Sequence, residues 1–200
     1  MVSKAKLLIY MENERKVIIA KRLSAYDIKH MYDSVSSMQG LCPVCHNVLR
    51  KIPNRDYNIG RHPNSDVFFT YDSYLIVSQK FRDFCLRNEY SGLHFDELPQ
   101  SYGYYHMLID NIYKLDYERS RTLFLNKRDC CGSYDEIIGW DPSFRAKDNI
   151  LDERADGFYR AEYLGGSFSD KSIEPVIGLV TYKRMIKEKF RGIIYLNVYI

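Results

Sequence analysis

The chain has 200 residues, of which 46% are hydrophobic and 28% charged, a globular composition that argues against a disordered or fibrous protein. Its 29 basic and 26 acidic residues leave a formal net charge of +3, which is small for a dedicated nucleic-acid binder. No apolar run approaches the roughly 20 residues of a membrane span. The first apolar stretch stops at Glu12, too early for a secretory signal. We therefore expect a cytoplasmic protein without a membrane partner, and the charge disfavours nucleic acid.

Tyrosine is unusually frequent, with 18 Tyr against 10 Phe and a single Trp. Tyr combines an apolar ring with a polar tip, which suits protein-binding surfaces. It is also common in β-strands. The tyrosine content therefore fits either a binding surface or a fold rich in sheet.

The N-terminal part of the chain alternates strand patterns with a single helical one. Lys6–Tyr10 and Lys16–Ala20 predict the two strands of a hairpin. Ser24–Ser37 predicts a short helix, because its apolar residues recur at helical spacing behind a possible Ser N-cap. A loop-rich segment follows from Gly40 to Ser65, and Asp66–Thr70 predicts a further strand.

A helix with clear boundaries is predicted after Ser78. The apolar run Ser73–Val77 precedes it, Ser78 is a typical N-cap, and Gly92 provides a left-handed C-terminal residue. A strand beginning at Leu93 comes next. The apolar stripe of this helix consists of Phe81, Phe84, Cys85 and Leu86. Cys85 is therefore expected in the core.

The C-terminal part repeats this order of elements. The run Pro175–Val180 leads to Thr181, which we interpret as a second N-cap. Gly192 ends the second helix, and Ile193–Ile200 predicts a strand. The apolar stripe of this helix consists of Tyr182, Met185, Ile186 and Phe190.

The repeated order indicates an internal duplication with a period of roughly 100 residues. We predict an α+β fold of two related lobes, each a strand–capped helix–Gly–strand module, packed as one unit. The N-terminal lobe spans residues 1–100 and carries the CxxC loop. The C-terminal lobe spans residues 101–200 as a degenerate duplicate, with strands predicted at Met107–Tyr113 and Thr122–Leu125.

The sharpest local motif is Cys42-x-x-Cys45, a spacing that lets two thiolates converge on one Zn²⁺ at about 2.3 Å. Cys130 and Cys131 are adjacent, and neighbouring side chains of an extended segment point apart, so we expect only Cys131 to ligate. His46 or His62 would complete a four-ligand site.

Two other interpretations of the cysteines stay open. The thiols could be the packed remnant of a zinc ribbon, which would require no cofactor, or a thioredoxin-type redox pair, although no βαβ pattern precedes them. The five His residues form no HExxH pattern, and neither a phosphate-binding loop nor a nucleophile elbow is present. We therefore expect that the protein is not an enzyme.

A family resemblance follows from the order of these motifs. A Cys-x-x-Cys pair, Asp66-Val67-Phe68, the capping Val77-Ser78, a helix and Gly92 resemble bacterial immunity proteins of polymorphic toxin systems, and more closely the double-CxxCG-motif group. Asp156-Gly157-Phe158 and Val180-Thr181 repeat the pattern more faintly. Two departures concern the zinc ligands: His46 replaces the glycine of the first CxxCG, and the second motif keeps only Cys131-Gly132.

The resemblance implies a cytosolic protein that binds a cognate toxin domain in a 1:1 complex and blocks its active site. Aromatic loop residues and nearby acids are the candidate contacts, because large aromatic side chains often dominate binding energy. Those candidates are Tyr102, Tyr104, Tyr105, Asp135, Glu136, Trp140 and Asp141. Trp140 fits a core position under a loop equally well. The alternative function is a zinc-ribbon adaptor that binds nucleic acid or has a regulatory role.

Overall fold

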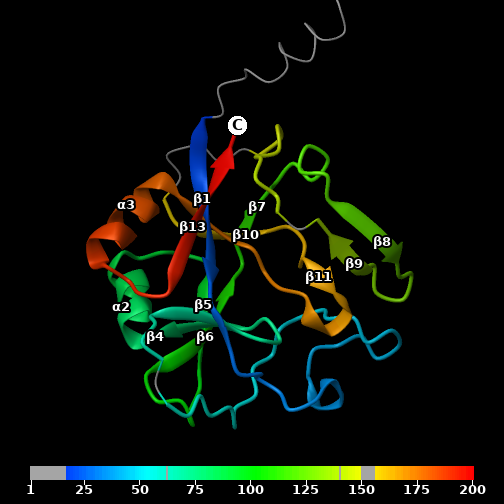
Figure 1. Ribbon diagram of the computed structural model, residues 1–200, viewed down its shortest axis with the longest axis horizontal. Helices are drawn as coiled ribbons and strands as arrows, with labels where there is room; N and C mark the ends of the chain where they lie inside the picture. The colour runs from blue at the N-terminus through cyan, green and yellow to red at the C-terminus, as the bar shows by residue number, and fades with distance from the viewer. Residues whose placement is uncertain (1–16, 62, 140, 150–155) are drawn as a thin grey trace, which may run out of the picture.

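Two five-stranded sheets, one three-stranded sheet and two α-helices are the main regular elements of the described protein. The computed structural model describes residues 17–61, 63–139, 141–149 and 156–200, and Figure 1 shows its α+β architecture. The strands are β1 (Ile18–Ala25), β2 (Asp27–Ile28), β3 (Val67–Thr70), β4 (Leu75–Ser78), β5 (Leu93–Glu97), β6 (Tyr104–Ile109), β7 (Ile112–Tyr113), β8 (Leu123–Lys127), β9 (Tyr134–Ile138), β10 (Phe158–Ala161), β11 (Gly166–Ser167), β12 (Pro175–Gly178) and β13 (Ile193–Tyr199). The α-helices are α2 (Gln79–Arg87) and α3 (Leu179–Glu188), and Val35–Ser37 and Phe168–Asp170 form short 3₁₀ helices.

The two large sheets have the same strand plan. The first sheet has the order β2-β3-β4-β6-β5, and the second, read from its β7 edge, has the order β7-β10-β12-β1-β13. In each sheet the edge strand β2 or β7 runs parallel to its neighbour and the other pairs are antiparallel. The registers also correspond. In the first sheet Tyr104 of β6 lies opposite Ser78, the last residue of β4, and in the second Ala20 of β1 lies opposite Gly178, the last residue of β12.

This correspondence pairs each element of the N-terminal half with one of the C-terminal half: β1 with β6, β2 with β7, β3 with β10, β4 with β12, α2 with α3, and β5 with β13. The chain is thus a duplication in which the two halves exchange strands. β1 lies in the sheet of the C-terminal half, and β6 lies in that of the N-terminal half. A boundary at residue 100 therefore does not separate the two sheets, because each sheet contains one strand from the other half of the chain.

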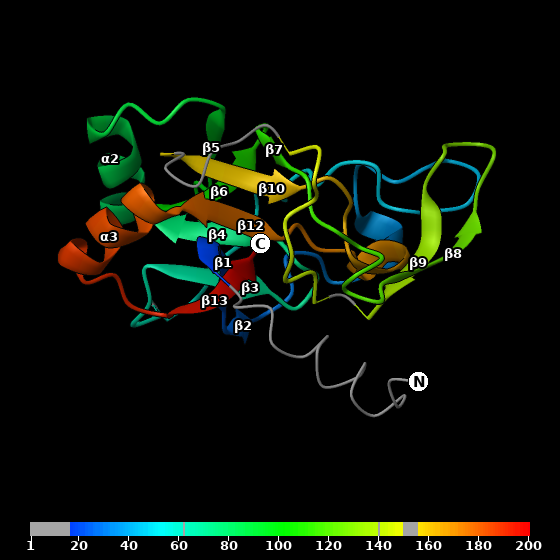
Figure 2. The same cartoon turned by 90° about the horizontal axis from the view of Figure 1, so that it is seen from above.

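The core lies between the two sheets and under both helices. Val67, Val77 and Met107 of the first sheet meet Leu23 and Ile177 of the second in one buried cluster. Phe81, Phe84 and Cys85 of α2 and Met185 of α3 belong to the same cluster, which confirms Cys85 as a core residue. Smaller clusters cover the outer faces of the two sheets. Figure 2 shows α2 and α3 side by side at one end of the molecule and the β8–β9 hairpin at the opposite end.

The sequence predicts the start of the first helix well and the start of the second poorly. The expected ends at Gly92 and Gly192 are wrong, because the first left-handed residues after α2 and α3 are Glu89 and Lys189. Ser78 is the N-cap of α2, and its hydroxyl accepts a hydrogen bond from the Phe81 N–H at 3.3 Å. The N-cap of α3 is Gly178, so the predicted cap at Thr181 is wrong. Thr181 lies buried in the first turn, and its hydroxyl donates to Asp156 Oδ1 at 2.7 Å. This bond resembles the one that Ser78 donates to Asp66 Oδ1 at 2.9 Å, which explains why the two residues looked equivalent.

The predicted helix at Ser24–Ser37 does not form. β1 continues to Ala25, β2 follows, and only Val35–Ser37 turns as a 3₁₀ helix. The carboxylate of Asp72 explains the difference, because it accepts hydrogen bonds from the backbone N–H groups of Met31 at 2.7 Å and Tyr32 at 3.0 Å. The strand predicted at Lys16–Ala20 is β1, which pairs with β12 and β13. Its predicted hairpin partner, Lys6–Tyr10, lies outside the described residues.

Gly192 lies where the chain between α3 and β13 touches the start of β3. Its φ is +85°, and a Cβ at this position would lie 2.7 Å from the carbonyl oxygen of Val67 and in closer contact with Ser65 Oγ. Gly192→Ala must therefore displace the backbone of β3, and we expect a loss of about 1–3 kcal/mol in the free energy of unfolding, measured in urea.

Gly60→Ala is the matched control for this substitution. Gly60 has a similar φ of +75°, but a Cβ there meets no atom within 4 Å. It therefore reports the backbone cost alone. Equal losses for the two variants would contradict the contact with β3.

No helix among the described residues combines the length and the apolar character that crossing a membrane requires.

Candidate metal centre

The first cysteine pair lies in a tight hairpin turn. The Cys42 N–H donates to the Asn47 carbonyl oxygen at 2.8 Å, and the His46 N–H donates to the Cys42 carbonyl oxygen at 2.9 Å. Leu41 and Val48 form an antiparallel bridge next to the turn. His46 has a φ of +58°, the left-handed conformation that glycine adopts most easily. His46 therefore occupies the glycine position of a CxxCG turn.

The second cysteine pair lies in a turn with the same backbone hydrogen bonds. Between β8 and β9, the Arg128 N–H donates to the Ser133 carbonyl oxygen at 2.7 Å, and the Gly132 N–H donates to the Arg128 carbonyl oxygen at 2.7 Å. Gly132 has a φ of +70° and corresponds to His46. Arg128 consequently stands where the first turn has Cys42, and Cys131 corresponds to Cys45.

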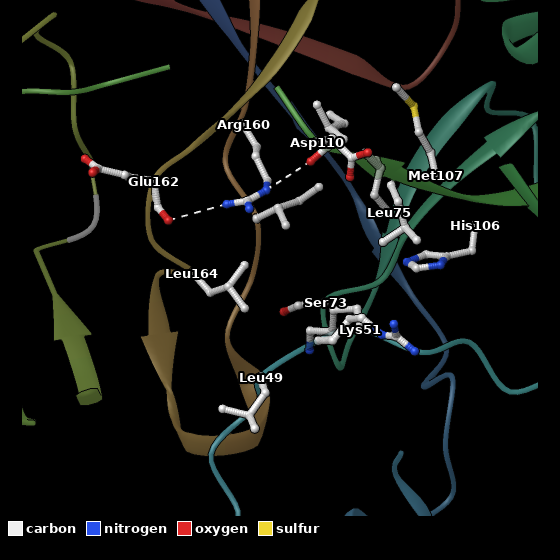
Figure 3. A pocket seen from close by; sticks show the side chains of 14 residues that line it. Leu49, Lys51, Ser73, Leu75, His106, Met107, Asp110, Arg160, Glu162 and Leu164 are labelled. Carbon is white, nitrogen blue, oxygen red and sulfur yellow. Dashed lines mark hydrogen bonds between the residues drawn. The ribbon is translucent and has the colours of Figure 1, made fainter. Parts of the chain in front are cut away.

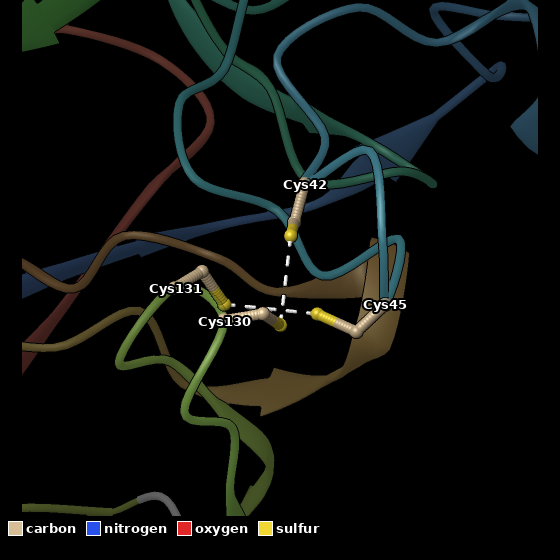
Figure 4. Close-up of side chains that lie close together, drawn as sticks. All are labelled: Cys42, Cys45, Cys130 and Cys131. Atoms are coloured by element: carbon tan, nitrogen blue, oxygen red, sulfur yellow. Dashed lines mark hydrogen bonds between the residues drawn. The ribbon is translucent and has the colours of Figure 1, made fainter.

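Cys130 occupies the position of Val44 in the first turn and supplies the thiol that Arg128 cannot. The expectation that only Cys131 would ligate is thereby corrected, since residues 129–131 form a turn and not an extended segment. The sulfur atoms of Cys42, Cys45, Cys130 and Cys131 all lie within 4.8 Å of one another (Figure 4). His62 lies outside the described residues, and with four thiols present no histidine is needed.

The sulfur geometry fits a tetrahedral metal ion. The Sγ atoms of Cys42 and Cys130 are 3.9 Å apart, and those of Cys45 and Cys131 are 3.6 Å apart. Bonds of about 2.3 Å to a tetrahedral Zn²⁺ place two sulfurs about 3.8 Å apart. A disulfide would require about 2.05 Å, and all five cysteines are free thiols. Hydrogen bonding from the Asn47 N–H lowers the pKa of the Cys45 thiol to about 7, whereas the hydrogen bond with Cys45 raises the pKa of Cys130 to about 12. Without a metal, Cys45 is therefore the cysteine of this pair that more readily forms the thiolate.

An ion pair between Arg128 and Asp135, together with the side-chain amide of Asn47, stabilises the second turn. The Arg128 guanidinium holds the carboxylate of Asp135 with Nε at 2.7 Å from Oδ1 and Nη2 at 2.6 Å from Oδ2. Asn47 Nδ2 donates to the same Oδ1 at 2.9 Å. The Arg128 hydrogen bond keeps the pKa of Asp135 below its usual range. Because Asn47 belongs to the first turn and Asp135 to β9, this contact fixes the two turns against each other.

Lys171 connects the same two turns. Its side chain is 1% exposed, and its ammonium donates to Asn47 Oδ1 at 3.2 Å, to Ser133 Oγ at 2.9 Å and to the Tyr134 carbonyl oxygen. Burial lowers the pKa of Lys171, and the negative charges of Asp135 and the nearby thiols oppose that effect. A buried ammonium requires a neighbouring negative charge. Four thiolates around a Zn²⁺ ion carry a net negative charge of this kind.

The residues expected to contact a toxin divide into two groups at opposite ends of the molecule. Tyr102 and Tyr105 belong to the β5–β6 hairpin, whose Gly103 carbonyl accepts a hydrogen bond from the first residue of α2 at 2.7 Å. Asp135 and Glu136 are on β9, and Figure 2 shows β9 far from α2. The structure therefore does not unite the two groups into one surface.

Burial separates these candidates further. Tyr102 is 86% exposed. Tyr104 is buried, and its hydroxyl donates to the Pro63 carbonyl oxygen at 3.2 Å, so the expectation that Tyr104 is a surface contact is wrong. Tyr105 is half-buried, with its hydroxyl donating to Gln79 and the Arg82 guanidinium 4.9 Å from its ring centroid.

The acidic candidates have mostly structural partners. Asp135 is only 2% exposed and forms the ion pair with Arg128 next to the metal centre. The expectation that it contacts a partner at the surface is therefore wrong. Asp141 is exposed and pairs with the buried Arg22, and Glu136 is partly exposed on β9. Trp140 lies outside the described residues.

The residues of the metal centre differ in how well the sequence predicts them. The glycine after Cys131 is the signal that aligns the second turn with the first and assigns Cys130 to the turn. Lys171 has no such signal, because nothing in its neighbourhood distinguishes it from an exposed lysine. Comparison with family models, curated proteins and solved structures found no match for this chain.

Proposed function

We propose that the chain is a non-catalytic immunity protein that acts in the cytoplasm by binding a cognate toxin domain in a 1:1 complex. The observation that carries this proposal is the presence of one cysteine turn in each half of a duplicated fold. The turns at Cys42–Asn47 and Arg128–Ser133 have the same two backbone hydrogen bonds and the same left-handed residue. The second turn is thus a CxxCG turn that has lost its first cysteine. This supports the resemblance to the double-CxxCG-motif immunity proteins, which rests on two such motifs.

We further propose that the four cysteines bind one structural Zn²⁺. Four protein thiolates fill all the positions of a tetrahedral ion, which is the arrangement of structural sites; catalytic zinc keeps a position for water. Such an ion joins residues 42–45 to residues 130–131 and thereby holds the two halves together. Its contribution to function is to fix the surfaces on either side of it.

The proposed contact surface is centred on Tyr102 in the β5–β6 hairpin. Its neighbour Ser101 is fixed to the segment before β3, because the Ser101 hydroxyl donates to the Tyr57 carbonyl oxygen at 2.8 Å and accepts from the Ile59 N–H at 2.9 Å. An exposed aromatic ring on an anchored loop loses little conformational entropy on binding. Tyr105 follows three residues later in the chain and contacts the Arg82 guanidinium of α2, and we propose that this pair extends the surface.

The experiment is co-expression of the full chain with the product of the adjacent gene. Capture of a toxin domain at 1:1 stoichiometry, together with restored growth, is the expected result. Absence of both for every neighbouring product would contradict the proposal. Binding of nucleic acid that weakens steeply with salt, without capture of a protein, would replace it by the adaptor function.

Tyr102→Ala should weaken the captured complex about tenfold or more, because truncating an anchoring aromatic costs about 2 kcal/mol or more. The affinity is measured by calorimetry on the purified pair. Tyr26→Ala is the matched control, since Tyr26 is 72% exposed but lies just before β2 and away from the β5–β6 hairpin. Equal effects of the two substitutions would exclude Tyr102 from the contact surface.

A further inference from the structure

A cavity of about 410 Å³ lies beside β6, and it shares Leu49, Glu162 and Leu164 with a smaller cavity that Cys131 lines. Pockets for small organic molecules typically have volumes of about 300–1,000 Å³ and apolar walls with a few polar groups. Leu75 and Leu164 contribute apolar wall, Lys51, His106 and Arg160 contribute nitrogen atoms, and the acidic residues Asp110 and Glu162 also line the cavity (Figure 3). Ile173 adds to the apolar wall. The cavity thus has the size and the mixed lining of a ligand site.

Lys51 places a buried ammonium at this cavity. Its side chain is 5% exposed, and its Nζ donates to the carbonyl oxygens of Asp72 at 2.7 Å and Ser169 at 3.3 Å. It forms no ion pair with a carboxylate in the described part of the chain. The carboxylate of Asp72 is occupied by the backbone N–H groups of residues 31 and 32. Burial lowers the pKa of Lys51 to about 8, with Asp72 and Asp170 opposing the shift, so the ammonium form still predominates at neutral pH.

Arg160 contributes a second cation that the described residues hold through carbonyl oxygens and not through an ion pair. Its guanidinium is fixed by three backbone carbonyl oxygens, those of Ile109 at 3.0 Å, Ala161 at 3.0 Å and Glu162 at 3.4 Å. Burial lowers the pKa of Arg160, and Asp110 opposes that effect. Asp110 itself holds His94, whose Nε2 lies 2.7 Å from Asp110 Oδ2. Within the described residues Arg160 therefore has no carboxylate as an ion-pair partner.

The duplicated fold supplies an internal comparison. By strand register, Arg22 of β1 corresponds to His106 of β6, and Arg22 lines a second cavity of about 360 Å³. There the protein neutralises its own cation, because Arg22 pairs with Asp141 and with Glu174 at 3.3 Å. At the cavity beside β6, His106 at the matching position lies 3.6 Å from a carboxylate oxygen of Asp96. The buried ammonium of Lys51 enters this cavity from a loop outside the compared strands, and within the described residues its hydrogen-bond partners are carbonyl oxygens.

We infer that the cavity beside β6 binds a small organic anion, whose acidic group pairs with Lys51 while Arg160 adds a second positive charge. The apolar body of the ligand packs against Leu75, Leu164 and Ile173. Exclusion of water strengthens the charge pairing, since the ammonium already lies in a low-dielectric environment. This inference is independent of toxin binding, because it concerns residues outside the proposed contact surface.

The test uses two dyes of nearly the same shape and different charge. The anion 8-anilinonaphthalene-1-sulfonate and the neutral N-phenyl-1-naphthylamine are titrated separately into the full chain, and fluorescence reports binding. We expect saturable 1:1 binding of the anion, at least about tenfold tighter than the neutral dye, and displacement by octanoate but not by octanol.

Lys51→Met should weaken binding of the anionic dye about tenfold or more and leave binding of the neutral dye unchanged. Lys183→Met is the matched control at an exposed lysine of α3. If Lys51→Met does not fold, Arg160→Met provides the same comparison between the two dyes. Equal affinity for both dyes, or an unchanged affinity of the folded variants for the anion, overturns the inference.

Discussion

A Cys45→Ser variant should contain no stoichiometric zinc, whereas the wild-type chain should contain one zinc ion per molecule. Cys45 Sγ lies 3.6 Å from the Sγ of Cys131 and belongs to the four-thiol cluster. Structural zinc in small domains has an apparent binding free energy of about 10–16 kcal/mol. Because this metal would join the two halves, its loss should cost more than the about 0.5–3 kcal/mol of an ordinary point mutation. Plasma emission spectrometry measures the metal, and urea unfolding measures the stability.

Cys85→Ala is the control, because Cys85 is a buried thiol of the core outside the cluster. It should retain one zinc ion per chain and lose only the stability that the small cavity costs. A strong chelator should lower the unfolding temperature of the wild type and of Cys85→Ala, but not that of Cys45→Ser. Stoichiometric zinc in Cys45→Ser, or stability unaffected by metal removal, would contradict the proposed centre.

Phe158→Ala should destabilise the protein by about 3–5 kcal/mol, the cost of removing a buried Phe side chain and leaving a cavity. Phe158 is fully buried on β10, and its ring centroid lies 5.7 Å from that of Phe81 and 5.2 Å from that of Tyr90. These contacts join the second sheet to α2 and to the residues after it, so no single element can close the gap. Urea unfolding monitored by circular dichroism gives the change in free energy.

Phe168→Ala is the matched control for Phe158→Ala. Phe168 is 46% exposed in the second 3₁₀ helix, and its removal should change stability by about 0.5 kcal/mol or less. A loss for Phe158→Ala no larger than that for Phe168→Ala would mean that the core between the sheets does not have the described packing.

Local signals made much of the fold predictable. Ser78 and the apolar stripe with Phe81 place the start and the buried face of α2 correctly, because capping and amphipathic spacing act within one helix. Gly92 does not mark its end, since α2 stops at Arg87 and Glu89 adopts the left-handed conformation. Thr181 misled the prediction, since its side chain serves a hydrogen bond to Asp156 that only the folded chain reveals. The exchange of β1 and β6 was not predictable, because strand pairing depends on residues far apart in the sequence.

The metal centre shows the same division between local and distant information. The spacing of Cys42 and Cys45 is a local signal and predicts half of the cluster. The sequence does not predict Cys130 as a ligand, because an extended segment would turn its side chain away from that of Cys131. The turn that brings the two side chains together forms between β8 and β9. Lys171, which joins the two turns, reaches them from a distant part of the chain.

The exchange of β1 and β6 also limits the order in which the two sheets can form while the chain is being synthesised. β1 is synthesised before the other described strands, yet its backbone partners are β12 and β13, which emerge from the ribosome last. Until then Ile19 and Leu23, which are buried in the finished fold, have no sheet to enter. Such a chain has high contact order and folds slowly, with unpaired strand edges open to wrong partners during synthesis. A ribosome-bound chain that lacks β13 should therefore still be sensitive to protease at β1, however complete its first sheet has become.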